Sequence, residues 1–522
     1  MHALSPAGSR QRTVVLLAGF GIVIALFAAV VIRWPDNFFA DDSYFYFQVA
    51  WNMARGRGST FNNVIPTNGY HPLWMLVCVA VFKLLPAKAA ALHGIGTAIA
   101  MFNAGTLALL VVILKRVAPG LWWVAIFVYS PFCFLTQLGT EGALSGFFLA
   151  ALVLATYALC TSPSGTRGAI FALCGTLAVL SRLDNIFIVS LIYLAVLVAA
   201  PSADRPRIRR ILLSCIPIYL LFWGAYLGSN LHWFGTIQPI SGLLKAHPHG
   251  EARVFHKPPH IAAFGLIVIL PSILLLARFC RDVFFRVVEL PFAVGVLVHA
   301  AYIALVMSSE TRWSWYYTSW ILLASILLSR VLWLVLKQWP LVCEALAAVS
   351  LVLLLAIWYV RSYRSFIHPI DPMLASYETN LSDRLHLHTV LAFDQPGRIA
   401  YYTDVHIVAL DGLMGDLQFQ RDLARKGIAA FAAEHGVDGF IGPPQPLDTD
   451  GRKWLCEQVH LSSVRFHCTP SAPGEWIVDR VEVFARLTGG SAGSLPLPQE
   501  NLVWNVPYRI AVWRIGETNE RR

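Results

Sequence analysis

The chain has 522 residues, of which 57% are hydrophobic and 13% are charged, and its mean hydropathy is +0.60. Because soluble globular chains carry about 25% charged residues, this composition excludes a soluble protein and indicates an integral membrane protein. The formal net charge of +10 does not indicate a nucleic-acid partner, since no basic tract is interleaved with aromatic residues and the basic excess lies in residues 1–359, with 24 Lys and Arg against 11 Asp and Glu.

The apolar segments predict a polytopic α-helical membrane protein with about eleven spans. The hydrocarbon core of a bilayer requires roughly 20 apolar residues per helix. The first such segment continues into Arg33-Trp34-Pro35 rather than into a cleavage site, so we expect it to be retained as a span. The candidate spans are 14–32, 90–114, 121–137, 141–160, 168–183, 184–200, 210–229, 261–279, 287–308, 315–336 and 341–360.

Residues 71–86 are short for a crossing and contain Lys83, so we expect an interfacial helix there. If the N-terminus is cytoplasmic, every basic cluster between spans then falls on the cytoplasmic side, as the positive-inside rule requires. This topology makes 1–360 a transmembrane module of the inner or plasma membrane, with 33–89 as an extracytoplasmic catalytic loop. It makes 361–522 an extracytoplasmic domain.

The segment Phe39–Trp74 has the residues of a site at the membrane surface. Asp41 and Asp42 are adjacent carboxylates followed by aromatic residues, among them Tyr44. A carboxylate there could act as a general base for an acceptor hydroxyl, or the pair could cap the helix that begins at Ser43. Asn68, Tyr70 and His71 follow on the same side of the membrane, either at the rim of a substrate cavity or as a turn with an interfacial anchor.

Further charged residues lie between later spans on the same predicted face. An ionisable residue next to an apolar span is costly unless it faces water or a partner, and Glu141 could either serve a site or cap a helix. The cations could hold a phosphate, pair with a neighbouring carboxylate or anchor the chain at the interface. The candidate residues between the later spans, charged and uncharged, are Glu141, Arg182, Asp184, Lys245, Arg312 and Tyr316.

The C-terminal part predicts a small α/β domain. An amphipathic helix is expected over Leu417–His435, and Leu487–Gln499 is rich in Gly, Ser and Pro and is expected to be a loop. Cys456 and Cys468 fall in this polar part, where either a disulfide or two free thiols fits the sequence. The expected strands are Arg398–Tyr402, His406–Leu410, Val437–Ile441, Trp476–Phe484 and Tyr508–Ile515.

The Asp41-Asp42 pair after a first span, together with Gly69-Tyr70-His71-Pro72-Leu73-Trp74, resembles the GT-C superfamily of multi-spanning glycosyltransferases. The nearest likeness is to its bacterial arabinofuranosyltransferase-like branch. Four shorter segments look like parts of the same pattern: Gly139-Thr140-Glu141-Gly142, Ser181-Arg182-Leu183-Asp184, Phe234-Gly235 with Lys245, and Tyr401-Tyr402-Thr403-Asp404.

The resemblance implies a polyprenyl-phosphate sugar as donor and no nucleotide cofactor. Asp41 or Asp42 would be the base, Glu141 a second active-site carboxylate, and Arg182, Lys245 or Arg312 the holder of the donor phosphate. The two aspartates would also suit a divalent metal. The expected substrate contacts are Tyr44, Asn68, Tyr70, His71, Asp184 and Tyr316.

We therefore expect an inverting glycosyltransferase that acts on an extracytoplasmic glycan, lipid or protein acceptor. The alternative from another class is a transporter or flippase of lipid-linked saccharides. Such a protein would carry charged or broken helices near the bilayer midplane, and often inverted repeats, whereas the polar residues here gather at one face and no repeat is seen. A non-catalytic polysaccharide-binding scaffold is the third alternative.

Overall fold

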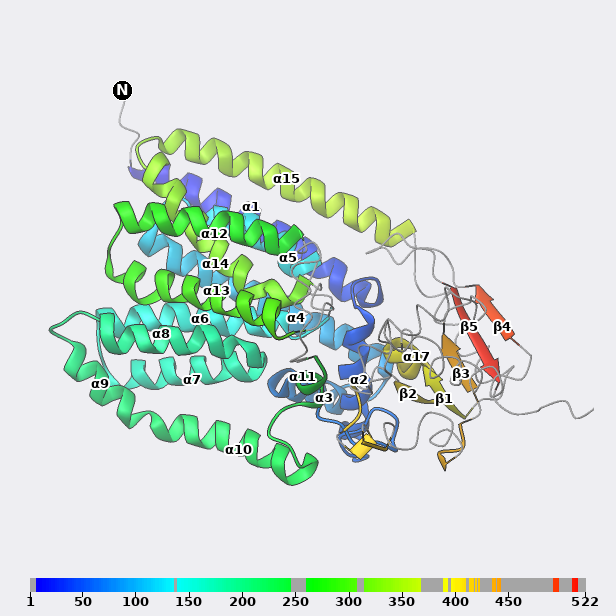
Figure 1. Cartoon of the computed structure of the whole chain (residues 1–522). Helices are drawn as coiled ribbons and strands as arrows, with labels where there is room; N and C mark the ends of the chain where they lie inside the picture. Colours follow the sequence, from blue (N-terminus) through cyan, green and yellow to red (C-terminus); the bar gives the residue numbers. More distant parts are fainter. Residues whose placement is uncertain are drawn as a thin grey trace, which may run out of the picture.

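The computed structural model describes the helical part of the chain almost completely and the C-terminal part in segments. A bundle of long helices occupies one side of the molecule and a small sheet the other (Figure 1). Between them lie the short helices α2 (Asp41–Ala54), α3 (Pro72–Leu84), α11 (Ile240–Lys245) and α17 (Pro396–Tyr402). The described residues are 6–135, 139–245, 260–307, 314–367, 388–392, 396–409, 413–416, 418–419, 421–422, 434–437, 439–442, 492–496 and 509–514.

The bundle confirms a polytopic helical membrane protein. Each of the eleven predicted spans corresponds to a helix, and seven of the helical segments have the length and composition of a membrane crossing. The seven lie in α1 (Pro6–Arg33), α4 (Lys88–Val117), α6 (Gly142–Thr161), α9 and α10 (Arg205–Ser214 and Ile216–Phe234), α13 (Leu290–Leu305) with the π-helical turn before it, α14 (Thr318–Leu336) and α15 (Pro340–Ile367).

The other four predicted spans are shorter apolar helices packed among the long ones. They are α5 (Trp122–Leu135), α7 (Gly165–Ser181), α8 (Ile186–Ala199) and α12 (His260–Phe279). The segment expected to be interfacial forms α3 (Pro72–Leu84), whose 13 residues are fewer than the roughly 20 that cross a bilayer. It packs against α2 (Asp41–Ala54), which follows the first span.

The C-terminal segments form one five-stranded mixed sheet in the order β2-β1-β3-β5-β4. Strand β1 pairs in parallel with β2 and β3, and β5 pairs antiparallel with β3 and β4. The strands confirm the predictions at His406–Leu410, Val437–Ile441 and Tyr508–Ile515. Their bounds are β1 (Thr389–Ala392), β2 (His406–Ala409), β3 (Gly439–Gly442), β4 (Ala492–Pro496) and β5 (Arg509–Arg514).

Two predictions for this region were wrong. Arg398–Tyr402, predicted as a strand from its β-favouring tyrosines, is part of the helix α17 (Pro396–Tyr402), which begins with a proline at the position where helices tolerate it best. Leu487–Gln499, predicted as a loop, contains β4, because pairing with β5 satisfies its backbone whatever its composition. Trp476–Phe484, Cys456, Cys468 and most of Leu417–His435 lie outside the described residues.

A buried ion cluster ties together the helix ends that lie away from the short helices. Arg330 is 2% exposed, and its Nε donates to Glu289 Oε1 at 3.1 Å. Its Nη2 donates to Asp282 at 2.9 Å, and its Nη1 donates to the carbonyl oxygen of Val117 at 2.9 Å. Because Glu289 precedes α13, Arg330 lies on α14 and Val117 ends α4, this one side chain fixes three helices at one end of the bundle.

We expect Arg330→Met to destabilise the folded protein by about 3–5 kcal/mol, because it leaves Glu289 as an unpaired buried carboxylate. The free energy of unfolding in detergent measures the loss. Adding Glu289→Gln should restore part of it, since the second change removes the uncompensated charge. Equal stability of wild type and Arg330→Met would show that the cluster contributes nothing.

Candidate active site

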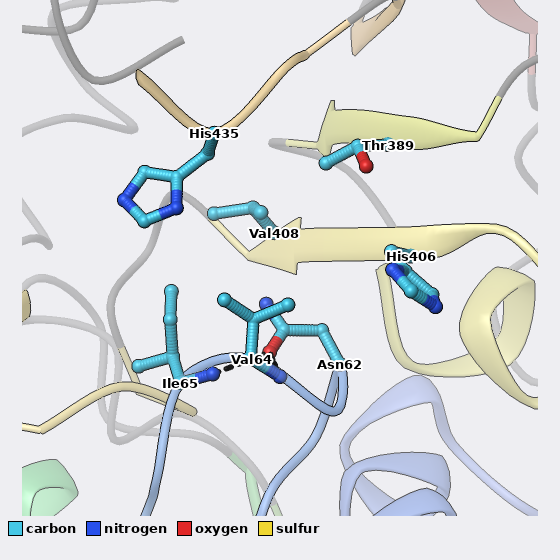
Figure 2. Close-up of a pocket in the computed structure, with 7 residues that line it drawn as sticks. All are labelled: Asn62, Val64, Ile65, Thr389, His406, Val408 and His435. Atoms are coloured by element: carbon cyan, nitrogen blue, oxygen red, sulfur yellow. Dashed lines mark hydrogen bonds between the residues drawn. The ribbon is translucent and has the colours of Figure 1, made fainter.

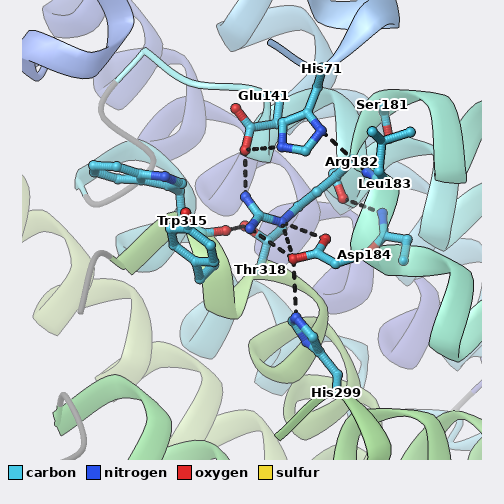
Figure 3. Close-up of polar contacts among 12 residues, drawn as sticks. His71, Glu141, Ser181, Arg182, Leu183, Asp184, His299, Trp315 and Thr318 are labelled. Carbon is cyan, nitrogen blue, oxygen red and sulfur yellow. Dashed lines mark hydrogen bonds and ion pairs between the residues drawn. The ribbon is translucent and has the colours of Figure 1, made fainter. Parts of the chain in front are cut away.

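The site is centred on Arg182, a cation held between two carboxylates. Its side chain is 3% exposed and lies in the short turn between α7 and α8. The guanidinium Nη1 contacts Glu141 Oε1, Nε lies 2.8 Å from Asp184 Oδ1, and Nη2 donates to Asp184 Oδ2 at 2.9 Å (Figure 3). A buried charge is tolerated when it is paired in this way, so Arg182 joins the turns before α6 and before α8.

Glu141 serves this network rather than the helix that it begins. It is the N-cap residue of α6, but its side chain makes no capping hydrogen bond. Its second oxygen accepts a hydrogen bond from the hydroxyl of Tyr46 on α2 at 3.1 Å. Glu141 thus lies at the N-terminus of α6, as the structural alternative placed it, and it also links α2 to the turn that carries Arg182.

His71, the residue before α3, joins the same network through its ring nitrogens. The backbone N–H of Leu183 donates to its Nδ1 at 3.2 Å, which places the ring proton on Nε2, 3.6 Å from Glu141 Oε1 (Figure 3). Burial lowers the pKa of His71 below 6.5, and the neighbouring Glu141 acts in the opposite direction. The sequence prediction placed His71 at a site, and the structure brings it to Glu141 and Arg182.

His299 and Trp320 belong to this network although the sequence analysis missed them. Trp320 Nε1–H donates to His299 Nδ1 at 3.1 Å, so His299 Nε2 carries the proton toward Asp184 Oδ2, also at 3.1 Å. The available signal was an ionisable residue inside an apolar span, which marks a functional candidate. His299 therefore fixes the carboxylate that holds Arg182.

Lys245 and Tyr316 form the second cationic part of the site. Lys245, at the end of α11 (Ile240–Lys245), donates to the hydroxyl of Tyr316 at 3.0 Å. The Tyr316 ring also covers the guanidinium of Arg182 at 4.2 Å. Burial alone would lower the pKa of Lys245, but Tyr316 and the carboxylate of Asp42 raise it above its ordinary value, so the amine is charged.

The two adjacent aspartates point to different partners. Asp41 accepts hydrogen bonds from the backbone N–H groups of Gly397 at 3.1 Å and Arg398 at 2.7 Å, so it caps α17 rather than its own helix. Burial raises the pKa of Asp41 to about 7, against the lowering effect of Arg398. Neither aspartate caps α2, whose N-cap is Ala40, without a side-chain hydrogen bond.

Asp42 makes no hydrogen bond or ion pair with any residue that the structure describes. Burial raises its pKa above 3.8, Lys245 lowers it and Glu141 raises it further. Asp42 therefore lies within the electrostatic influence of both residues, without a hydrogen bond or ion pair to either. A carboxylate in this position has its oxygens available to a ligand.

The remaining predicted substrate contacts lie around the site with partners of their own. Tyr44 is fully buried, and its hydroxyl donates to Asp36 at 2.5 Å. Asn68 donates to the carbonyl oxygen of Gln238 at 3.2 Å and accepts from the N–H of Ile240 at 2.9 Å, so it positions α11 and with it Lys245.

The last two predicted site residues are Tyr70, expected to contact the substrate, and Arg312, expected to hold the donor phosphate. The hydroxyl of Tyr70, one residue before His71, lies 2.7 Å from Ser59 Oγ. Arg312 lies outside the described residues.

The described residues form no ready-made site for the divalent metal that the aspartate pair suggested. They contain no group of three or more His, Cys, Asp or Glu side chains placed to hold a metal ion. The oxygens of Asp41 accept the amides of α17, and Glu141 is paired with Arg182. Because Mg²⁺ keeps several waters and is bound through one or two carboxylates together with substrate phosphates, a metal at the aspartate pair stays a prediction.

A small pocket lies beside the site, between the loop before α3 and the sheet (Figure 2). On the loop side, Asn62 Oδ1 accepts the N–H groups of Val64 and Ile65 at 3.1 and 2.9 Å, which fixes the shape of the loop. The opposite wall is formed by Thr389, His406, Val408 and His435.

The overall structure is similar to two solved membrane proteins. The first is ArnT from Cupriavidus metallidurans bound to undecaprenyl phosphate, with 11% sequence identity, a TM-score of 0.54 and 98% of each chain covered. The second is the oligosaccharyltransferase AglB from Archaeoglobus fulgidus in complex with an inhibitory peptide and a dolichol-phosphate. It has 12% identity and a TM-score of 0.47, with 82% of this chain and 69% of that chain covered.

No sequence-family model matches the chain, and no curated protein does. At 11% identity the likeness to ArnT shows the fold alone. The fold is of the GT-C type, as the resemblance of the sequence motifs implied.

We expect His299 and Trp320 to be energetically coupled. His299→Leu leaves the N–H of Trp320 without its acceptor and removes one of the donors to Asp184, which keeps its contacts with Arg182, and such losses cost about 1–3 kcal/mol. In a double-mutant cycle with Trp320→Phe, the free energies of unfolding should therefore be non-additive by roughly 0.5–3 kcal/mol. His299→Leu with the distant Ser214→Ala is the additive control. Additivity in both cycles would contradict the contact.

Proposed function

We propose that the protein is an inverting glycosyltransferase that moves a sugar from a polyprenyl-phosphate donor to an extracytoplasmic glycan, lipid or protein acceptor at the membrane surface. One observation carries this proposal: Asp42, a carboxylate without a partner in the described chain, lies in the field of the charged Lys245. The GT-C-type fold supports it, as does the undecaprenyl phosphate bound to the similarly folded ArnT.

In the proposed reaction Asp42 is the general base. It takes the proton of the acceptor hydroxyl while the acceptor oxygen bonds to C1 of the sugar and the bond from C1 to the phosphate oxygen breaks. One displacement inverts the configuration at C1. The raised pKa of Asp42 makes it a stronger base than an ordinary aspartate, because proton uptake relieves the cost of a buried charge.

The leaving phosphate gains negative charge as the bond to C1 breaks. Lys245 Nζ and the Tyr316 hydroxyl are 3.0 Å apart and together offer a cation and a donor that are already in place, which lowers the barrier without reorganisation. Arg182 was predicted to hold the phosphate too. Since its charge is balanced by Glu141 and Asp184, we assign it to positioning Tyr316, which it contacts ring to guanidinium.

We also propose the topology and the domain division that the sequence suggested: eleven spans, a cytoplasmic N-terminus, a catalytic module 1–360 and an extracytoplasmic domain 361–522 of an inner or plasma membrane protein. The arrangement in Figure 1 supports this proposal, since α9 with Arg205, Arg207, Arg209 and Arg210 lies at the end of the bundle away from α2 and the sheet. Basic residues favour the cytoplasmic side of a membrane.

Asp42→Asn should lower the transfer rate by about 10²–10⁴-fold, because it removes the base. In wild type the transfer rate should fall as the pH decreases through the pKa of Asp42, which is raised above 3.8, since only the carboxylate accepts a proton. This acid limb of the pH–rate profile should vanish in Asp42→Asn. The loss of rate and its pH dependence are both measured by assaying sugar transfer by the purified protein from a panel of polyprenyl-phosphate sugars. Asp204→Asn, far from the site, is the control. An Asp42→Asn protein with full activity would sink the assignment.

Lys245→Met should raise the KM for the donor and lower kcat, by about 10²–10³-fold in kcat, the loss seen when one preorganised charge-stabilising donor is removed. Lys245→Arg should recover part of the activity because it keeps the charge. The measurement is steady-state kinetics with the donor found above, with the exposed Lys83→Met as control. Unchanged donor kinetics in Lys245→Met would place the phosphate elsewhere.

A further inference from the structure

Helix α17 follows the last span in sequence but packs on the first turn of α2. Asp41 accepts two of its backbone amides, and the Arg398 guanidinium donates in return to the carbonyl oxygen of Phe39 at 2.6 Å. The two backbones approach so closely that a Cβ added to Gly397 would lie 2.4 Å from the carbonyl oxygen of Asp41. Only glycine fits there.

The far end of α17 is fixed as firmly. Tyr402 donates its hydroxyl to Asp36, the acceptor that Tyr44 of α2 also uses. Tyr401 is fully buried and donates to the carbonyl oxygen of Lys88 at 2.8 Å, and its ring lies 5.4 Å from that of Tyr44. Arg398, Ile399 and Ala400 are also at most 2% exposed. Helix α17 is therefore part of the buried core against which the catalytic loop packs.

A second backbone contact lies on the other side of the site. A Cβ added to Gly69, two residues before His71, would lie 1.9 Å from the carbonyl oxygen of Leu413. Leu413 follows α17 and β2 in the chain. Helix α17 therefore touches the catalytic loop at Asp41, next to the proposed base, and Leu413 touches it at Gly69, near His71.

We propose that α17 and Leu413 are an integral part of the active site, and that Asp41 is a positioning residue that orients Asp42 through its contact with α17. This inference rests on the proposed function. Successive residues of a helix point about 100° apart, so anchoring Asp41 on α17 turns Asp42 away from α17. The adjacent aspartates thus divide two tasks, docking and proton transfer, that a single carboxylate could not perform.

The kinetic test compares Asp41→Asn, Asp41→Ala and Asp42→Asn. Asp41→Ala should lower kcat by about 10²-fold, the cost of misplacing a reacting group by about 1 Å. Asp41→Asn should lose less, because its amide oxygen still accepts one N–H of α17. Both should keep the acid limb of the pH profile and the wild-type KM for the donor, whereas Asp42→Asn loses the limb.

A steric variant tests the second contact. Gly69→Ala must push Leu413 away and should lower kcat per folded molecule. Gly224→Ala is the matched control, because a Cβ there meets no atom within 4 Å. Hydrogen exchange provides a readout that does not require activity: the amides of Gly397 and Arg398 should lose protection in Asp41→Ala and keep it in Asp42→Asn.

Two outcomes would overturn the inference while leaving the proposed function intact. If Asp41→Asn abolishes transfer and removes the acid limb while Asp42→Asn retains both, Asp41 is the base. If the transfer rates of the Asp41 and Gly69 variants fall only as far as their folded fractions fall, α17 has a structural role alone. Absence of transfer by wild type from any donor would refute the proposed function instead, and unchanged exchange of Gly397 and Arg398 in Asp41→Ala would separately refute the docking contact.

Discussion

The burial of the Arg182 charge is the constraint on which the rest of the site depends. An arginine that is 3% exposed persists only if its charge and its N–H groups are satisfied, and Glu141 and Asp184 do this from two different turns. Each carboxylate has a further partner, Tyr46 for Glu141 and His299 for Asp184. One buried cation therefore holds α2, α6, α8 and α13 in a fixed arrangement at one end of the bundle.

This arrangement separates the charged residues that support the site from those that are free to act. Arg182, Glu141 and Asp184 compensate one another inside the network, and Asp41 is occupied by α17. Asp42 and Lys245 influence each other's pKa, and in the proposed reaction Asp42 would accept the proton while Lys245 would supply a fixed positive charge. Transfer from a phosphate needs both roles at once, a base on the attacking side and a cation on the leaving side.

The C-terminal region has a direct part in this arrangement. Its helix α17 lies between α2 and the sheet (Figure 1), and two glycines, Gly397 and Gly69, mark where its backbone and that of the catalytic loop meet without room for a side chain. Contacts of this kind do not tolerate displacement, since a packed interior resists even the volume of one methyl group.

The sequence by itself determined where the helices lie and which residue types end them, because a bilayer requires long apolar segments and makes isolated charges next to them costly. It thus identified Asp41, Asp42, His71, Glu141, Arg182, Asp184 and Lys245 as candidates. It could not distinguish Asp41 from Asp42, since the two neighbours share one sequence context. It also could not predict the helix α17, because the tyrosines at its end favour a strand. Only the tertiary structure decided these points, because the role of a carboxylate depends on the donor that faces it, and here those donors come from residues up to 357 positions away.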